Sequence, residues 1–255
     1  MPTAGDPARK PGPLDVRIER KAFRAADGTD TVVLRDLHFA LAPGSFTCLI
    51  GPSGCGKTTT LRIILGLERA FEGSVARHPP GLRAAAVFQE PRLLPWRTVE
   101  QNVRLALPPP TEAAPTAAEL DRLFAVLGLD ALRGRYPSEL SLGLARRVAL
   151  ARAFAVKPDL LLLDEPFVSL DEHTADRLRA HLMELWQAEG TTVLMVTHNL
   201  REAARLADRL LLLNGRPASL VGDVAVPLAR GARGGETLTR FLAALARDHP
   251  ATILA

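Results

Sequence analysis

Residues 46–60 read F-T-C-L-I-G-P-S-G-C-G-K-T-T-T, and the fold follows from this stretch. The short apolar run 46–50 predicts a buried strand, and a helical pattern begins at Thr58. Between them, the segment from Gly51 to Thr58 fits G-x-x-x-x-G-K-[ST] without a gap. Its glycines let the backbone curl so that consecutive N–H groups point at phosphate oxygens, and the helix N-terminus adds partial positive charge. The stretch therefore predicts a phosphate-binding loop.

The side chains of this loop suggest a nucleotide and a divalent cation. Lys57 would neutralise the β- and γ-phosphates, and the hydroxyl of Thr58 would bind Mg²⁺. The other expected contacts to the nucleotide come from Gly51, Pro52, Ser53, Gly54, Cys55, Gly56 and Thr59. Cys55 allows two interpretations: a redox-sensitive thiol activated by the helix N-terminus, or a small side chain that fills the loop. For the whole motif the alternative is a glycine-rich turn with a surface lysine.

A second apolar run, 160–163, predicts a buried strand that ends in Asp164 and Glu165. Ligands of parallel sheets bind at the carboxyl ends of the strands. Asp164 is suited to hold Mg²⁺ through water, and Glu165 is suited to orient and deprotonate an attacking water. A solvated acidic strand end is the alternative. Together with the phosphate loop, this acid pair indicates an enzyme that hydrolyses a nucleoside triphosphate.

Apolar strands alternate with helical patterns elsewhere, which predicts an α/β fold with a largely parallel sheet. Further strands are expected at 14–18, 31–34, 84–88, 192–196 and 210–213, and helices at 58–65, 120–127, 144–154, 178–185 and 202–207. Gly66 and Gly73 are expected to end the first helix. Residues 108–119 read as a surface linker, and about 97–156 as a helical insert. After Gly215 we expect a small strand pair and a helix at 237–245.

Composition excludes several classes of protein. The 255 residues carry a net charge of +4, with no Lys/Arg run that would indicate a nucleic-acid surface. The longest apolar runs fall far short of the roughly 18–20 residues that span a bilayer. Two cysteines make no disulfide framework, and no histidine has zinc-like spacing. Residues 1–13 lack a signal-peptide core and are expected to form a disordered lead-in, followed by one domain over 14–248 and a tail at 249–255.

The motifs and their order resemble the nucleotide-binding subunit of ATP-binding-cassette (ABC) transporters, from about residue 14 to 215. The resemblance implies a P-loop NTPase fold with an antiparallel β subdomain and a helical subdomain. It also implies further site residues. Gln89, in V-F-Q-E-P-R, resembles the glutamine loop that reaches Mg²⁺ and the water. His198, in V-T-H-N, resembles the switch histidine at the γ-phosphate, and Phe23 the aromatic that stacks on adenine. The alternatives are a solvated amide, a core imidazole and a core aromatic, respectively.

The segment L-S-L-G-L at 140–144 resembles the family signature, which closes over ATP held by a partner chain. Ser141 and Gly143 keep the family pattern, while Leu142 and Leu144 replace a glycine and a glutamine of L-S-G-G-Q. The replacements put the contribution of the signature to ATP affinity in question. Asp171, in S-L-D, resembles the loop after the acid pair, and it could also be a helix N-cap.

The resemblance implies an ATPase that uses ATP and Mg²⁺ and forms a head-to-tail dimer with ATP between the chains. It implies a separate membrane permease, a place on the cytoplasmic face of the inner membrane and, indirectly, a periplasmic solute-binding protein. The stretch 87–96 resembles importers of nitrate, sulfonate or taurine, so import of a small anion is expected. Residues 92–96 are either a docking patch for the permease or packed within the subunit. Two other interpretations are a soluble ABC ATPase acting on nucleic acid or ribosomes, and a non-hydrolysing ATP-binding subunit.

Overall fold

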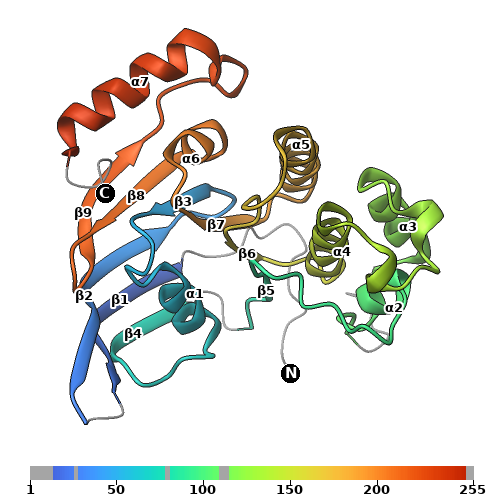
Figure 1. The fold of residues 1–255 in the computed structure, drawn as a ribbon, viewed down its shortest axis with the longest axis horizontal. Helices are drawn as coiled ribbons and strands as arrows, with labels where there is room; N and C mark the ends of the chain where they lie inside the picture. Colours follow the sequence, from blue (N-terminus) through green and yellow to red (C-terminus); the bar gives the residue numbers. More distant parts are fainter. Residues whose placement is uncertain (1–13, 26–27, 78–80, 109–114, 251–255) are drawn as a thin grey trace, which may run out of the picture.

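The computed structural model describes residues 14–25, 28–77, 81–108 and 115–250, and it contains two sheets (Figure 1). The larger has the strand order β5-β6-β7-β3-β8-β9, and the smaller has the order β2-β1-β4. The strands of the larger sheet are β3 (Phe46–Ile50), β5 (Ala84–Val87), β6 (Leu160–Asp164), β7 (Thr192–Thr197), β8 (Arg209–Asn214) and β9 (Ser219–Ala225). Those of the smaller sheet are β1 (Leu14–Arg24), β2 (Asp30–Leu41) and β4 (Glu72–Arg77).

Five strands of the larger sheet run parallel, and β9 pairs antiparallel with β8 at one edge. Every residue of β3, β6 and β7 is buried, as expected for strands covered on both faces. The smaller sheet is antiparallel throughout. The predicted α/β fold with a mostly parallel core sheet and an antiparallel subdomain is therefore confirmed.

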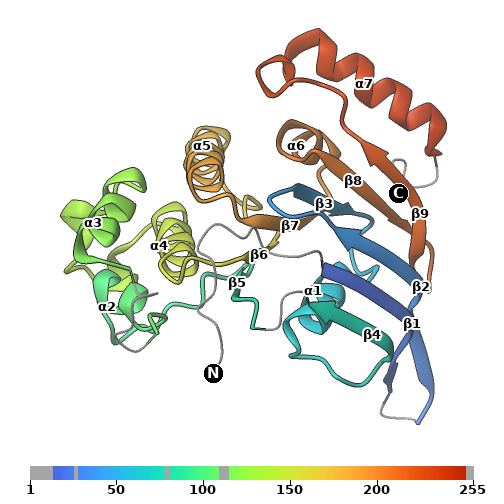
Figure 2. The same cartoon turned by 180° about the vertical axis from the view of Figure 1, so that it is seen from behind.

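The central strands send alternate side chains to two separate cores. On one face, Leu49, Leu162 and Leu194 pack with the smaller sheet and with α1 (Lys57–Leu65), which lies between the two sheets (Figures 1 and 2). On the other face, Phe46 and Leu161 pack with helices. These helices are α4 (Leu142–Phe154), α5 (Glu172–Glu189), α6 (Leu200–Leu206) and α7 (Gly235–Asp248). The sheet thus fixes its strand ends rigidly between two apolar layers.

The predicted helical insert gathers beside β5 and β6, at one end of the molecule (Figure 1). It comprises α2 (Val99–Arg104), α3 (Ala117–Val126) and α4, with short 3₁₀ turns at Asp130–Leu132 and Pro137–Glu139. A third such turn, Arg230–Ala232, precedes α7. Thr98 and Thr116 start α2 and α3 through reciprocal capping boxes with Gln101 and Glu119. Because these caps and Ser141 set the starts, α3 and α4 begin two to three residues earlier than predicted.

Three expectations about chain segments need correction. Gly73 does not end a helix but pairs with β1 inside β4 at φ 130°, where a side chain would overlap the carbonyl of Arg17. Residues 117–119 of the predicted linker belong to α3, and 109–114 lie outside the described residues. After Gly215 a single strand, β9, extends the main sheet in place of a strand pair, because it hydrogen-bonds to β8.

The helix expected at the C-terminal end is confirmed as α7. The predicted lead-in 1–13 and most of the predicted tail lie outside the described residues. Within the ranges that the structure describes, no helix has both the length and the apolar character needed to cross a membrane.

Candidate active site

Four neighbouring strands of the larger sheet have their carboxyl ends on the same side of the sheet, and a predicted motif follows each of them. The phosphate loop follows β3, the acid pair stands at the end of β6, His198 follows β7 and Gln89 follows β5. Parallel strands place their carboxyl ends together, so segments far apart in sequence meet here. This edge is the candidate active site.

The phosphate loop turns into α1 at Gly56, whose φ of 103° lies in the left-handed region. A Cβ at this position would stand 2.6 Å from Cδ2 of Leu34, so both the backbone and the packing require glycine. The ammonium of Lys57 is buried and donates to the carbonyls of Gly51 and Pro52, each at 2.8 Å. One of its three N–H groups is left for a phosphate oxygen.

The hydroxyl of Thr58 donates to Oδ1 of Asp164 at 3.0 Å, which joins the loop to the acid pair. Burial raises the pKa of Asp164, and the hydrogen bond from Thr58 opposes that rise. Hydroxyl and carboxylate oxygens are the hard donors that Mg²⁺ prefers. Among the described residues, no group of three or more His, Cys, Asp or Glu side chains could hold a metal alone. The pair fits Mg²⁺ in the usual way, as one or two protein oxygens that share the cation with phosphates.

Glu165 and His198 lie in contact, with Nδ1 of the imidazole 3.2 Å from Oε1 of the carboxylate. The backbone of Glu165 is left-handed at φ 44°, and its N–H donates to the carbonyl of Val196 at 3.0 Å. Such strained residues persist where surrounding structure holds them, often at functional sites. A cavity of about 210 Å³ lies beside the two side chains, and Ser169 and Thr197 also line it.

Sequence reasoning missed a buried ion pair beneath His198. Arg179 and Glu202 are each less than a tenth exposed, and Nη1 donates to Oε1 at 3.0 Å. The hydroxyl of Thr197 donates to the second oxygen of Glu202 at 3.3 Å and accepts from the N–H of Asn199 at 3.0 Å. Burial raises the pKa of Glu202, and Arg179 opposes that rise. The available signal was an arginine between Leu178 and Leu182, on the apolar face of the predicted helix.

Asn199, which departs from the commoner aspartate of the family pattern, has a structural role. Its side chain caps α6 by accepting from the N–H of Glu202 at 3.0 Å. Asp171 likewise caps α5 by accepting from the N–H of Thr174 at 3.0 Å, and hydrogen bonding with Thr174 lowers its pKa. The helix-cap interpretation of Asp171 is thus seen directly, and any role toward a partner chain is additional.

The signature segment forms the start of α4. Ser141 caps this helix, and its hydroxyl accepts from the N–H of Leu144 at 3.3 Å. Gly143 is buried in the first turn, where a Cβ would overlap Cγ2 of Thr174 on α5. Across the described ranges, no hydrogen bond joins Ser141 to the phosphate loop.

Phe23 lies on β1 in the smaller sheet and is 42% exposed. Nζ of Lys21 stands 4.2 Å from its ring centroid, and the same ammonium donates to the carbonyl of Ala70 and pairs with Glu68. Phe23 and Lys21 line an open hollow of about 560 Å³. The structure thus presents Phe23 at the surface and not in the core.

Two further predicted site residues, Cys55 and Gln89, differ from each other in their surroundings. Burial raises the pKa of the Cys55 thiol, which favours the loop-filling interpretation over a reactive thiol. Gln89 is exposed, and its carbonyl accepts from Arg146 at 3.3 Å. In the segment 92–96, Leu93 packs against the core, as the interpretation of packing within the subunit predicts, while Trp96 is 68% exposed; docking of a permease here stays a prediction.

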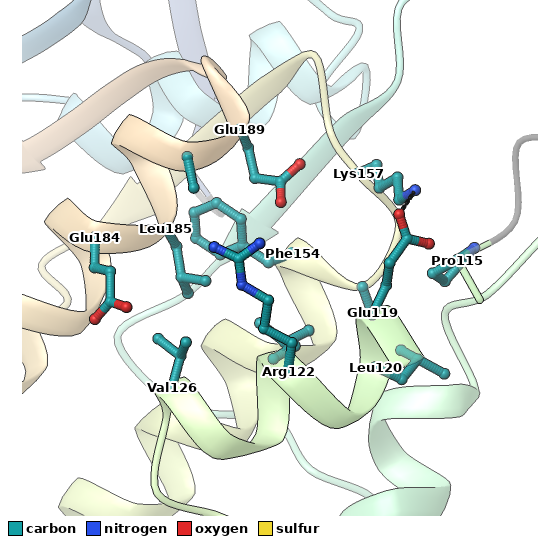
Figure 3. A pocket seen from close by; sticks show the side chains of 13 residues that line it. Pro115, Glu119, Leu120, Arg122, Val126, Phe154, Lys157, Glu184, Leu185 and Glu189 are labelled. Carbon is teal, nitrogen blue, oxygen red and sulfur yellow. Dashed lines mark hydrogen bonds and ion pairs between the residues drawn. The ribbon is translucent and has the colours of Figure 1, made fainter. Parts of the chain in front are cut away.

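A separate cavity of about 100 Å³ lies between α3 and α5 (Figure 3). Its floor is apolar, with Leu123, Phe154 and Leu185, and charged side chains surround its mouth. These are Arg122, Glu184, Glu189 and the ion pair of Glu119 with Lys157. No predicted site residue lines this cavity, so it is not part of the candidate active site.

Residues 34–168 match the family model described as ABC transporter. The aliphatic sulfonates import ATP-binding protein SsuB 2 of Burkholderia lata is 41% identical over 222 residues, covering 85% of this chain and 78% of that protein. SsuB 1 of Pseudomonas aeruginosa is 44% identical over 230 residues, covering 86% and 89%.

Among solved structures, the dimeric ABC transporter cassette MJ0796 matches with a TM-score of 0.73 and 26% identity, over 85% of this chain and all of that one. Its post-hydrolysis state, bound to ADP and Pi, gives a TM-score of 0.71. These matches confirm the resemblance drawn from the motifs. The chain therefore belongs to the ABC transporter family, as an ATP-binding subunit that is an ATPase.

Proposed function

We propose that this chain hydrolyses ATP to power import of a small organic anion, first of all an aliphatic sulfonate, through a separate membrane permease. The observation that carries the ATPase chemistry is the pair of contacts Thr58–Asp164 and Glu165–His198, which join three motifs at one sheet edge. The solute class is supported by relatives that are named as aliphatic sulfonate import proteins.

ATP would bind with its phosphates in the curled loop 51–58. Backbone N–H groups and the N-terminus of α1 provide positive potential there. The third N–H of the Lys57 ammonium would donate to a phosphate oxygen. Phe23 would stack on the adenine with the ring face that Lys21 leaves open.

Thr58 and Asp164 would hold Mg²⁺, with Gln89 as a further oxygen ligand. When bound, the cation neutralises charge on the transferring phosphoryl group. The carboxylate of Glu165 would accept a proton from the attacking water. Nδ1 of His198 would donate to the carboxylate of Glu165, which leaves Nε2 facing away; Nε2 would donate to a γ-phosphate oxygen when the ring carries both protons.

The working unit would be a head-to-tail dimer, because the chain carries one copy of each motif and the signature would complete the nucleotide site of a second copy. Ser141 and the first turn of α4 would instead meet the γ-phosphate held by a second copy. The dimeric arrangement of the similar cassette MJ0796 supports this. Residues 14–248 would act as one ATPase domain on the cytoplasmic face of the inner membrane, fed by a periplasmic solute-binding protein.

The test is ATP binding and phosphate release by the purified chain, alone and with its permease. Lys57→Ala is expected to abolish both activities. The matched control, Lys157→Ala, removes a lysine that pairs with Glu119 away from the site and is expected to keep both. Uptake of an alkanesulfonate, taurine and nitrate by vesicles that contain the complete transporter then tests the solute. Equal ATP turnover in both lysine variants would contradict the proposed site.

A further inference from the structure

The helix α4 reaches across to the loop after β5 with two arginines. Nη1 of Arg146 donates to the carbonyl of Pro166 at 2.9 Å, and Nη2 donates to the carbonyl of Gln89 at 3.3 Å. One turn and a half further on, Arg152 donates to the carbonyls of Pro91 and Arg92, both at 2.8 Å. Side chains of α4 therefore hold three carbonyls of the glutamine loop.

Arg152 uses both of its terminal nitrogens. Each nitrogen of the planar guanidinium fork donates to one of two neighbouring carbonyls, whereas a single ammonium, as at Lys57, reaches both of its carbonyls from one atom. The carbonyl of Arg92 belongs to a residue in the left-handed region at φ 47°. A non-glycine residue holds such a conformation only where neighbouring groups fix it.

The second half of the loop is fixed by α2. Asn102 is fully buried and accepts from the N–H of Leu94 at 2.8 Å. Its amide nitrogen is within 3.2 Å of the carbonyls of Leu94, Arg97 and Thr98. Residues 89–98, here called the 89–98 loop, are thus held by α4 at one end and α2 at the other. Pro95 and Trp96 are left exposed between Leu94 and Arg97, both of which Asn102 holds.

We propose that Arg152 is a positioning residue that makes α4 and the 89–98 loop move as one body. The N-terminus of α4 bears Ser141, the loop begins at Gln89, and its exposed tip bears Trp96. A displacement of α4 caused by ATP binding then also displaces the tip of the 89–98 loop. In the same way, a displacement of the tip also displaces Ser141. This inference rests on the proposed function, since the exposed tip is the surface that a permease would contact.

The chain offers a matched control on the same helix. Arg147 is also partly buried, and it donates to the carbonyl of Leu127 at 3.4 Å, away from the 89–98 loop. Arg152→Ala and Arg147→Ala therefore remove the same side chain from neighbouring turns, and only the first releases the loop. Arg152→Lys keeps the charge but offers one donor nitrogen on a shorter, non-planar end in place of the two that hold Pro91 and Arg92.

The first experiment uses Trp96 as a probe. Trp186→Phe leaves it as the only tryptophan, and this change loses no hydrogen bond, because Nε1 of Trp186 is buried without a partner. In that background, ATP without Mg²⁺ is expected to change quenching of Trp96 by iodide. Arg147→Ala is expected to keep the change. Arg152→Ala and Arg152→Lys are expected to lose it while ATP affinity, measured with a fluorescent ATP analogue, stays within about twofold.

The second experiment measures stimulation of phosphate release by the permease. Arg152→Ala is expected to lower stimulation by roughly tenfold, a usual size for coupling between sites, with little effect on release by the chain alone. The proposal is overturned if Arg152→Ala matches Arg147→Ala in both assays, or if the lysine variant restores coupling. A parent chain that binds and hydrolyses no ATP would instead overturn the proposed function.

Discussion

Thr58 and Asp164 are 106 residues apart in sequence, yet Oγ1 of one donates to Oδ1 of the other at 3.0 Å. The contact places the start of α1 beside the end of β6, and Glu165 is the next residue along the chain. Both oxygens are held in place by buried structure, α1 under the smaller sheet and β6 within the larger one. Asp164 therefore contacts the loop before any nucleotide arrives.

Replacing Glu165 with glutamine should abolish steady-state hydrolysis and leave ATP binding intact. An amide keeps the shape of the side chain but cannot accept the proton of the water, so a loss of about 10²–10⁴-fold is expected in phosphate release. Glu184→Gln, on α5 and away from the strand ends, is the control. Turnover at the parent rate in Glu165→Gln would remove this residue from the role.

The altered signature should weaken dimer formation. Leu142 is 43% exposed and Leu144 offers no side-chain hydrogen bond, so neither can bind a phosphate or ribose of ATP on a partner chain. In a Glu165→Gln background, Leu144→Gln is expected to shift the ATP-dependent monomer–dimer equilibrium toward dimer in sedimentation velocity. A chain that stays strictly monomeric with ATP, in both forms, would count against the head-to-tail arrangement.

Gly143 should tolerate no side chain while Thr174 is present. A Cβ at position 143 overlaps Cγ2 of Thr174, so in Gly143→Ala either Thr174 leaves its rotamer or α4 shifts away from α5. Overpacking of this kind costs about 1–3 kcal/mol in free energy of unfolding, measured by denaturant titration. The double variant with Thr174→Ser, which removes that methyl group, should recover the loss. No recovery would mean that the strain lies elsewhere.

The ion pair of Glu119 with Lys157 should make stability depend on pH in the acid range. The hydrogen bond from Lys157 lowers the pKa of Glu119 from 4.5 to about 2. Because the folded-state pKa is the lower one, this contribution is complete above about pH 4.5 and is lost as the pH falls toward about 2. The difference in denaturation midpoint between the parent and Glu119→Gln should therefore shrink from about pH 5 to pH 3.

Lys157→Gln is the matched partner in that titration, since it removes the other half of the same pair. Lys157→Gln should keep a smaller part of the pH dependence, because hydrogen bonds from Thr116 still lower the pKa of Glu119, and the double variant should behave like Glu119→Gln. A pH dependence that is unchanged in either single variant would show that other carboxylates carry it.

The sequence predicted the parts of the site that are local. The phosphate loop and the acid pair each consist of a strand and the residues that directly follow it. Their position relative to that strand can therefore be predicted from the local sequence. The largely parallel character of the sheet was predictable as well, because apolar runs such as those of β3 and β6 are typical of strands covered on both faces. The order of the strands was not predicted.

Contacts between distant segments were not predictable in this way. Arg152 meets the carbonyls of residues 91 and 92 across about 60 positions, and nothing in the local pattern distinguishes it from any other basic residue of α4. The starts of α3 and α4 were also misplaced, since apolar periodicity marks the buried face of a helix and side-chain caps mark its first residue. The buried pair of Arg179 with Glu202 was missed because its partners lie on different helices.

The reactive groups come from loops that leave adjoining strands, and this has a consequence for how the protein tolerates change. Neighbouring strands are about 4.8 Å apart because of their main-chain hydrogen bonds. The distances between the phosphate loop, the acid and the imidazole thus depend on the spacing of the strands, which main-chain hydrogen bonds set and side chains do not. A residue such as Leu142 can therefore differ from the L-S-G-G-Q pattern while the distances within the reaction centre stay the same.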